Sequence, residues 1–198
     1  MRHVQPMPRS SGRSPPGGFR AAAGHDDGMR PKREPVRRQE PGPGQESVWD
    51  YPRPPRVEAR SERVVVRLGG EVVADTAAAF RVLETSHPPV WYLPRTAFVE
   101  GALQPAAGTS MCEYKGRARY VDVVGGGGVR ASSAGWTYPS PWAGYEMLVD
   151  HVALYPGRME SCEIDGEVVQ AQEGDFYGGW ITSSVVGPFK GAPGTMGW

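Results

Sequence analysis

Glycine and proline interrupt this chain so often that only short secondary-structure elements can form between them. The 198 residues include 27 Gly and 20 Pro. Proline cannot continue the interior of a helix or of a central strand, and glycine weakens both. The intervening runs are rich in β-branched and aromatic side chains, which favour strands. We therefore predict a mostly β protein, built from short antiparallel strands that include 63–68, 71–75, 90–93, 118–124 and 151–155.

Several neighbouring runs are joined by short turn signals and are predicted to form β-hairpins. Gly-Gly and Asp-Gly readily adopt the positive φ angles of tight hairpin turns. The predicted hairpins are 63–75 with Gly69-Gly70 at the turn, 160–170 with Asp165-Gly166 at the turn, and 118–138 across the loop Gly125 to Gly128.

Two segments have features of a helix. In residues 141–149, Ser140 is a candidate N-cap and Pro141 occupies the first helical position, so this segment is predicted to be the one short helix of the domain. The alanine content of residues 77–84 also favours a helix. The alternation of Phe80 and Val82 favours a strand instead, and we prefer the strand.

The composition changes near residue 46. Residues 1–46 contain 8 Pro, 7 Gly and a single aromatic residue, so they carry too little apolar surface to offset the entropy of ordering. We predict a disordered Pro/Gly/Arg-rich tail there, in which Met29 is an alternative translation start. Residues 47–198 hold 18 of the 19 aromatic residues and are predicted to form a single β domain, with 174–198 as an irregular aromatic and Gly-rich tail packed on it.

Charge and hydropathy exclude several classes of protein. The formal net charge is zero, with 22 basic and 22 acidic residues, which argues against a dedicated nucleic-acid-binding protein. No run approaches the ~18 apolar residues of a transmembrane helix, and no secretory signal is evident. We therefore expect a cytoplasmic protein that binds neither nucleic acid nor a membrane. Two Cys are too few for a disulfide framework or a four-Cys zinc site.

Lysine usage gives the strongest indication of a binding site. The chain has 19 Arg but only three Lys, and the two outside the tail occur as Tyr114-Lys115-Gly116 and Phe189-Lys190-Gly191. In a chain that otherwise uses Arg, a retained Lys suggests that the position needs a compact ammonium rather than a forked guanidinium. A following glycine lets the backbone approach a ligand or adopt a positive φ angle. We therefore predict that Lys115, with Tyr114, Gly116 and Lys190, binds a small anionic ligand.

Other side chains are candidates for the same site. Cys112 lies three residues before Lys115, and a nearby cation favours a reactive thiolate, although a structural cysteine is the commoner case. His87 could form a dyad with Cys112 or be a partly buried structural residue. Trp136 and Tyr138 alternate along a strand, so they could form an aromatic wall beside Lys115 or belong to the core.

The sequence shows no convincing metal or cofactor motif. The Cys and His residues at positions 87, 112, 151 and 162 lack the close spacing of zinc ligands. Glu163 and Asp165 could share a face, but Asp165 is better explained as a turn residue. We therefore expect no metal and no cofactor.

The motifs Cys112-Glu113-Tyr114-Lys115-Gly116 and His87-Pro88-Pro89-Val90-Trp91-Tyr92-Leu93-Pro94 resemble the bacterial domain of unknown function 427. This family also carries the label of a nucleotidyltransferase domain. The resemblance covers roughly residues 56–169 and implies a compact β-tent fold similar to Mss4-like domains. Those relatives often bind zinc through two CxxC pairs, which this chain lacks.

Two functions remain open from the sequence. The first is a non-catalytic module that binds a small anionic ligand at the Tyr-Lys-Gly site. The second is a small-molecule or nucleotide-directed enzyme, nucleotidyltransferase-like by its family label, that uses Lys115 or Cys112 as the reactive group. The chain contains no Asp-x-Asp pair of the kind that holds magnesium in such enzymes. The binding module is the preferred hypothesis.

Overall fold

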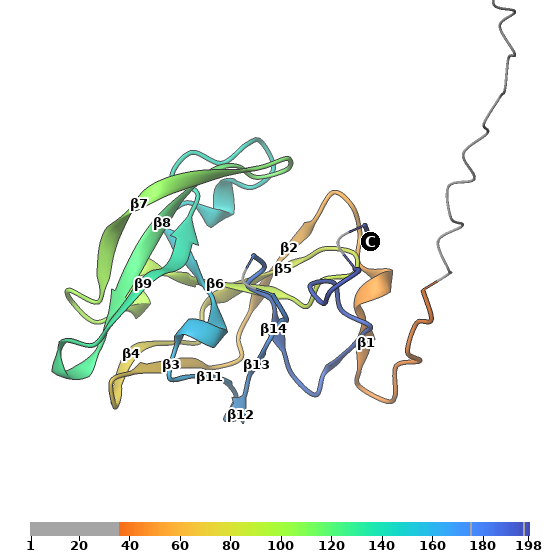
Figure 1. Cartoon of the computed structure of the whole chain (residues 1–198), viewed down its shortest axis with the longest axis horizontal. Coiled ribbons are helices and arrows are strands. Elements are labelled where there is room, and N and C mark those ends of the chain that lie inside the picture. Colours follow the sequence, from red (N-terminus) through yellow and green to blue (C-terminus); the bar gives the residue numbers. More distant parts are fainter. Residues whose placement is uncertain (1–35, 175, 196) are drawn as a thin grey trace, which may run out of the picture. The chain divides into compact units, whose positions relative to one another are not determined.

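Antiparallel strands make up most of the regular structure in the computed structural model, which describes residues 36–174, 176–195 and 197–198 (Figure 1). The larger sheet has seven strands, in the order β2 (Arg56–Arg60), β5 (Ala79–Leu83), β6 (Val90–Pro94), β10 (His151–Leu154), β9 (Arg130–Thr137), β8 (Gly116–Val124) and β7 (Leu103–Cys112). The predicted mostly β fold is therefore confirmed.

A second sheet forms from the two predicted tight hairpins. Its strand order is β12 (Glu167–Val168), β11 (Ser161–Ile164), β3 (Val64–Leu68) and β4 (Glu71–Thr76). Gly69 and Gly70 have φ angles of 64° and 77°, and Asp165 and Gly166 have 48° and 84°. Positive φ at both central residues is the geometry that such two-residue turns require. The pairing of β11 with β3 then joins the two hairpins into one sheet.

Residues 77–84 contain a strand, as preferred from the sequence, and β7 is a strand that the sequence analysis did not predict. β5 pairs with both β2 and β6. β7 spans ten residues in which Pro105 and Gly108 obscure the strand pattern. Its register with β8 shifts between Pro105 and Thr109, and this irregularity accommodates both residues within a long hairpin.

The helix predicted over residues 141–149 is wrong. The described part of the chain contains no α-helix there, only the short 3₁₀ helix η4 (Glu146–Leu148). Gly144 has a φ angle of 91°, which is incompatible with a continuous right-handed helix. The Trp142 amide instead donates to the Lys115 carbonyl at 3.2 Å, so the start of this segment is bound to the β7–β8 turn, and its internal main-chain hydrogen bonds are limited to short i→i+3 turns.

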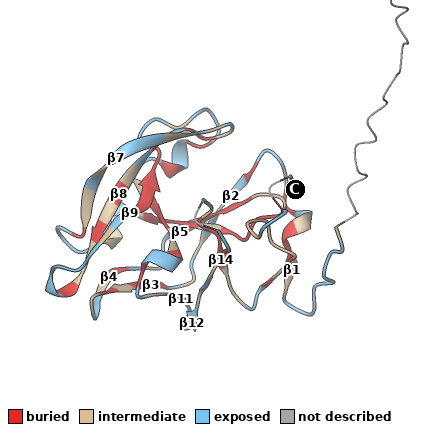
Figure 2. Ribbon diagram, in the orientation of Figure 1, coloured by how far each residue is buried: buried red, intermediate tan, exposed pale blue. Residues whose placement is uncertain are grey.

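Apolar side chains fill the space between the sheets, and Figure 2 shows buried residues concentrated in the centre of the domain. Trp91 and Leu93 of β6 belong to this core together with Val66 and Cys162 of the smaller sheet. Burial raises the pKa of the Cys162 thiol to about 12, so this cysteine remains protonated and structural. The remaining short helices are η1 (Val48–Asp50), η2 (Arg95–Ala97), η3 (Gly126–Gly128) and η5 (Pro156–Arg158).

The two ends of the described chain pack on each other. β1 (Glu46–Ser47) pairs in parallel with β15 (Val185–Val186), and β13 (Gln170–Ala171) pairs with β14 (Trp180–Ile181). The Gln39 amide donates to the Gly187 carbonyl at 3.0 Å, so contacts with the domain begin before the sequence boundary at Ser47. The rest of the predicted tail, residues 1–35 with Met29, lies outside the described residues.

Within the described residues, every helix is too short and too polar to span a lipid bilayer.

Trp180 is expected to be essential for stability, because it links the C-terminal segment to the core. It is 1% exposed, lies against Trp91, and its indole Nε1 donates to the Leu154 carbonyl at 3.2 Å. We expect Trp180→Ala to lower the free energy of unfolding by about 3–5 kcal/mol in chemical denaturation. Val168→Ala, at a position 66% exposed, should change it by less than about 0.5 kcal/mol. Similar values for both variants would contradict this packing.

Candidate functional site

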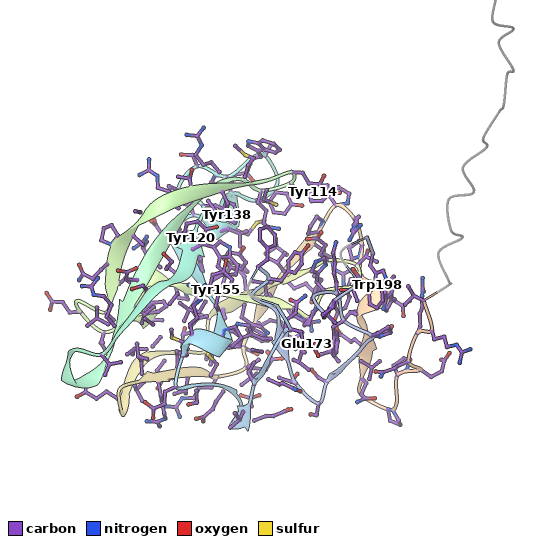
Figure 3. All side chains as sticks on the ribbon, in the orientation of Figure 1. Tyr114, Tyr120, Tyr138, Tyr155, Glu173 and Trp198 are labelled. Atoms are coloured by element: carbon purple, nitrogen blue, oxygen red, sulfur yellow. The ribbon has the colours of Figure 1, made fainter. Side chains whose placement is uncertain are left out.

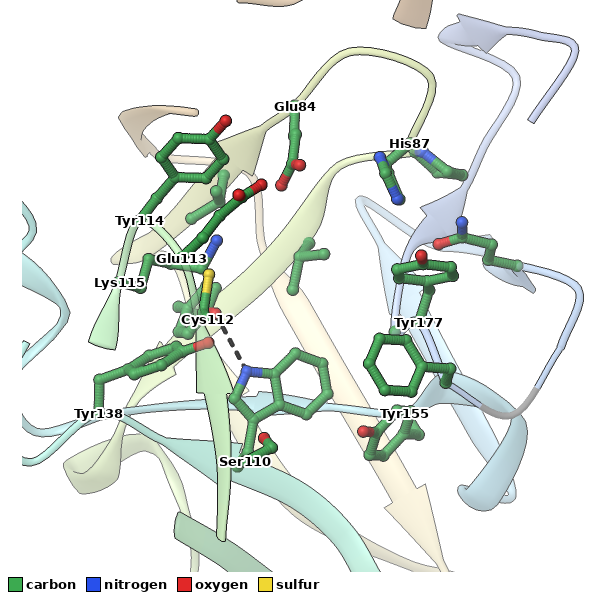
Figure 4. Close-up of a pocket in the computed structure, with 18 of the residues that line it drawn as sticks. Glu84, His87, Ser110, Cys112, Glu113, Tyr114, Lys115, Tyr138, Tyr155 and Tyr177 are labelled. Carbon is green, nitrogen blue, oxygen red and sulfur yellow. Dashed lines mark hydrogen bonds between the residues drawn. The ribbon is translucent and has the colours of Figure 1, made fainter. Parts of the chain in front are cut away.

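The domain contains a cavity of about 400 Å³ between the larger sheet and the C-terminal segment that follows β13 (Figure 4). Strands β5 to β9 contribute one wall, and residues 172–190 contribute the other. Figure 3 shows several of its tyrosines on the inner side of the bend formed by β7, β8 and β9. The lining is rich in aromatic residues, which are Tyr92, Tyr114, Tyr120, Trp136, Tyr138, Tyr155, Phe176 and Tyr177.

The aromatic floor of the cavity is an interlocked cluster. The Trp136 indole Nε1 donates to the Tyr92 hydroxyl at 3.1 Å, and the two rings meet edge-on. The rings of Trp136 and Tyr155 are 4.7 Å apart. Burial raises the pKa of the Tyr92 and Tyr138 hydroxyls well above their usual range, so both stay neutral. A Cβ at Gly178 would come within 2.3 Å of Trp136, so only glycine lets the opposite wall approach this floor.

Lys115 lies in the turn between β7 and β8, and its side chain is buried in the cavity wall with 7% exposure. Its ammonium is 6.0 Å from the centroid of the Tyr145 ring. Within residues 36–198 as described, no carboxylate lies within 4.0 Å of Nζ, and Nζ has no hydrogen-bond acceptor. Lys115 therefore lines the cavity with an ammonium that has no ion-pair partner within 4.0 Å among the described residues.

Gly116 supports the Tyr-Lys-Gly turn from outside the cavity. Its φ angle is 90°, as the sequence analysis allowed, and a Cβ there would lie 3.0 Å from the Trp142 ring. Gly116 is not among the cavity-lining residues. Its role in the structure is to form the turn and to make room for Trp142.

Cys112 is half-buried at the end of β7 and lines the cavity near Lys115. The hydroxyl of Tyr138 lies beside its thiol. Figure 4 shows His87 on the opposite side of the cavity, and no hydrogen bond joins the two among the described residues. The structure therefore does not form the Cys112–His87 dyad, because the two residues belong to different walls.

His87 and Lys190 belong to the opposite wall. The Lys190 ammonium donates to the Trp198 main-chain oxygen at 2.9 Å and lies 5.6 Å from the centroid of the Tyr177 ring. His87 Nδ1 is 3.0 Å from the Thr85 carbonyl, and its ring meets Tyr177 edge-on at 4.6 Å. Burial lowers the pKa of His87 below its ordinary value of 6.5. Unlike Lys115, Lys190 already has a main-chain partner.

Sequence reasoning missed several residues that line the cavity. Glu84 follows β5 and lies 3.8 Å from Arg53. Gln172 bridges the wall, because its side chain accepts from the Gly179 amide and donates to the Lys190 carbonyl. These residues come from separate segments, and no local pattern marks them. Tyr177 lies in an aromatic and Gly-rich stretch that composition alone assigned to packing.

The acidic and histidine residues considered as metal ligands have structural roles. Asp165 accepts from the Arg63 amide at 2.8 Å within its turn, and Glu163 lies 3.8 Å from Arg67. His151 Nδ1 is 2.9 Å from the Val149 carbonyl. Within the described ranges, no group of three or more His, Cys, Asp or Glu residues could hold a metal ion.

Comparison with models of known protein families shows the family to which the chain belongs. The sequence model of the domain of unknown function DUF427 matches residues 56–165, more than half of the chain. The protein belongs to the DUF427 family. The DUF427 region contains the aromatic floor, His87 and the turn with Cys112 and Lys115, whereas Gln172, Tyr177 and Lys190 lie beyond it. No curated protein matches the sequence.

Two buried cations, Lys115 without an ion-pair partner and Arg81 with two, allow a matched test of how pairing affects stability. The Arg81 guanidinium bonds to Glu46 at 2.9 Å and to Glu58 at 2.8 Å. We expect Arg81→Met to lower the free energy of unfolding by about 2 kcal/mol or more, because it leaves two carboxylates without their partner. Lys115→Met removes the charge of a buried residue that has no ion-pair partner, so no anion is left unpaired and stability should stay equal or rise by up to about 1 kcal/mol. Chemical denaturation measures both, and a large loss for Lys115→Met would contradict an unpaired ammonium.

The lowered pKa of His87 predicts a pH dependence of stability. Above about pH 6.5 this histidine is neutral in both the folded and unfolded states. Below that pH the unfolded chain takes up a proton that the folded domain resists, so stability falls as the pH drops. We expect the free energy of unfolding to fall more steeply between about pH 7 and about pH 5 in the wild type than in His87→Phe. Parallel profiles would contradict a neutral buried His87.

Proposed function

We propose that this DUF427 domain binds a small anionic ligand with a planar body, and that the ligand's anionic group pairs with Lys115. The observation that carries the proposal is the Lys115 ammonium, which belongs to a buried residue of the cavity wall and has no carboxylate within 4.0 Å among the described residues, although Glu84 and Glu113 also line the cavity. A charge in that position is costly unless it is paired. The Tyr145 ring offsets part of this cost. A carboxylate or phosphate in the cavity would supply the missing partner.

The shape and lining of the cavity support a planar body. A volume of about 400 Å³ falls within the usual range for small-molecule sites, roughly 300–1,000 Å³. Trp136, Tyr138 and Tyr155 offer ring faces and edges to a flat ligand. The concentration of aromatic groups beside the ammonium of Lys115 favours an aromatic carboxylate or a mononucleotide over a small inorganic anion.

Cys112 supports the alternative of a small-molecule or nucleotide-directed enzyme, because it lines the same cavity as Lys115. Thiol catalysis needs a general base within hydrogen-bond reach. His87 belongs to the other wall, and the raised pKa of Tyr138 keeps its hydroxyl protonated, so no phenolate is available to take the thiol proton. A binding module therefore agrees better with the geometry. The two packed antiparallel sheets also support an Mss4-like β-tent arrangement, which we include in the proposal.

The proposal predicts that binding depends on the charge of Lys115. We expect the wild type to bind benzoate, 2-naphthoate or adenosine monophosphate, and to bind the neutral benzamide more weakly. Lys115→Met should weaken binding of the anions by about tenfold or more, as expected for loss of a charge-assisted contact. Isothermal titration calorimetry and ligand-observed NMR measure these affinities, and the carboxylate and phosphate probes distinguish the two anion types.

Arg117→Met is the matched control. Arg117 is an exposed residue of the same hairpin, is absent from the cavity lining, and its replacement changes the net charge by the same amount. We expect Arg117→Met to bind the probes like the wild type. Equal binding by the Lys115→Met and Arg117→Met variants would overturn the assignment of Lys115.

A further inference from the structure

The wall opposite Lys115 contains a second buried polar group that faces the cavity, the Nε2 atom of His87. His87 is 7% exposed and lines the cavity. Figure 4 shows it on the side that carries Tyr177, across from Lys115 and Cys112. Its Nδ1 atom is bound to the Thr85 carbonyl at 3.0 Å, whereas Nε2 has no hydrogen-bond partner among the described residues.

The contact with Thr85 determines the tautomer of His87. A carbonyl oxygen can only accept, so Nδ1 must carry the proton and donate it. In the neutral ring Nε2 is then a hydrogen-bond acceptor. The edge-on contact with the Tyr177 ring holds the imidazole in this orientation. The lone pair of Nε2 is therefore fixed in direction, in a residue that lines the cavity.

Burial keeps the His87 ring neutral, and the surrounding charges partly oppose one another. Glu84 lies three residues before it, Arg53 approaches from the N-terminal segment, and Lys190 approaches from the C-terminal segment. Burial has the largest effect on its pKa and lowers it, the two cations act in the same direction, and Glu84 opposes them. Tyr177 contributes an uncharged ring.

We propose that His87 Nε2 is the second recognition point of the cavity, so that the preferred ligands are planar anions with an O–H or N–H donor at the end opposite the anionic group. This inference rests on the proposed function, because Lys115 binds the other end. A ligand with a methyl group in the donor position would leave Nε2 without a partner and desolvated. Sites built to bind a donor discriminate strongly against analogues that lack it.

Two pairs of probes test this selectivity at two ligand lengths. They are 4-hydroxybenzoate with 4-methylbenzoate, and 6-hydroxy-2-naphthoate with 6-methyl-2-naphthoate. Hydroxyl and methyl groups are similar in size but differ in their ability to donate. We expect the wild type to prefer the hydroxyl member of at least one pair by about tenfold. The preference should disappear in His87→Phe, which keeps a flat ring, while the affinity for the methyl member is retained.

Glu84 is a charged hydrogen-bond acceptor that also lines the cavity, and it provides the control. Its carboxylate lies near Arg53, and Glu84→Gln keeps the size of the side chain. We expect Glu84→Gln to retain the hydroxyl preference. Loss of the preference in Glu84→Gln but not in His87→Phe would assign the donor to Glu84 and overturn the inference.

The wild-type protein provides a test without substitution. Ring ¹⁵N NMR should show His87 with its proton on Nδ1, and the hydroxyl preference should decline as the pH falls and His87 becomes protonated. A proton on Nε2 in the neutral ring would overturn the inference without any probe.

The outcomes separate this inference from the proposed function. Equal affinity for hydroxyl and methyl members at both lengths, with the Lys115 dependence intact, overturns only the role of His87. Equal binding of all four probes by the wild type and Lys115→Met, or no binding of any probe, overturns both.

Discussion

The central strands of the larger sheet are covered on both faces, and the alternation of side chains along them determines what each face contains. On β6, Trp91 and Leu93 point into the apolar core against the smaller sheet, whereas Tyr92 between them joins the aromatic cluster on the other face. On β10, Val152 and Leu154 belong to the core and Ala153 to the aromatic cluster. One period-two pattern therefore builds the hydrophobic core and the floor of the cavity together.

The two faces differ in the kind of side chain that they bury. The core side is aliphatic and tightly filled, and it includes the protonated thiol of Cys162. The cavity side is rich in tyrosine, whose hydroxyls require partners when they are buried. Trp136 and Tyr92 satisfy each other, but Lys115 and the Nε2 atom of His87 have no described hydrogen-bond partner. Both residues line the cavity, so the ligand that we propose would supply the partners that these two groups lack.

The second wall of the cavity depends on residues outside the stretch matched by the DUF427 family. The C-terminal segment is held by Trp180 in the core and by main-chain contacts of Gln172 and Lys190. Gly178 allows this segment to approach Trp136 closely. The region matched by the family thus provides the floor and the Lys115 turn, and the segment beyond it closes the space above them.

The sequence alone was sufficient to predict the elements whose backbone geometry depends only on residues close together in the chain. The Gly69-Gly70 and Asp165-Gly166 turns, and the strand at β5, follow from φ preference and period-two alternation. The rarity of lysine and the Tyr-Lys-Gly pattern singled out Lys115, and the motif resemblance indicated the family.

The helix expected over 141–149 did not form, because a positive φ at Gly144 and the contact of Trp142 with Lys115 outweighed its start signals. Only the tertiary structure placed His87 and Cys112 on different walls of the cavity. It also gave Lys190 a main-chain partner and left Lys115 without one. These outcomes depend on which distant segments form each wall, and the conformational preferences of neighbouring residues carry no information about that.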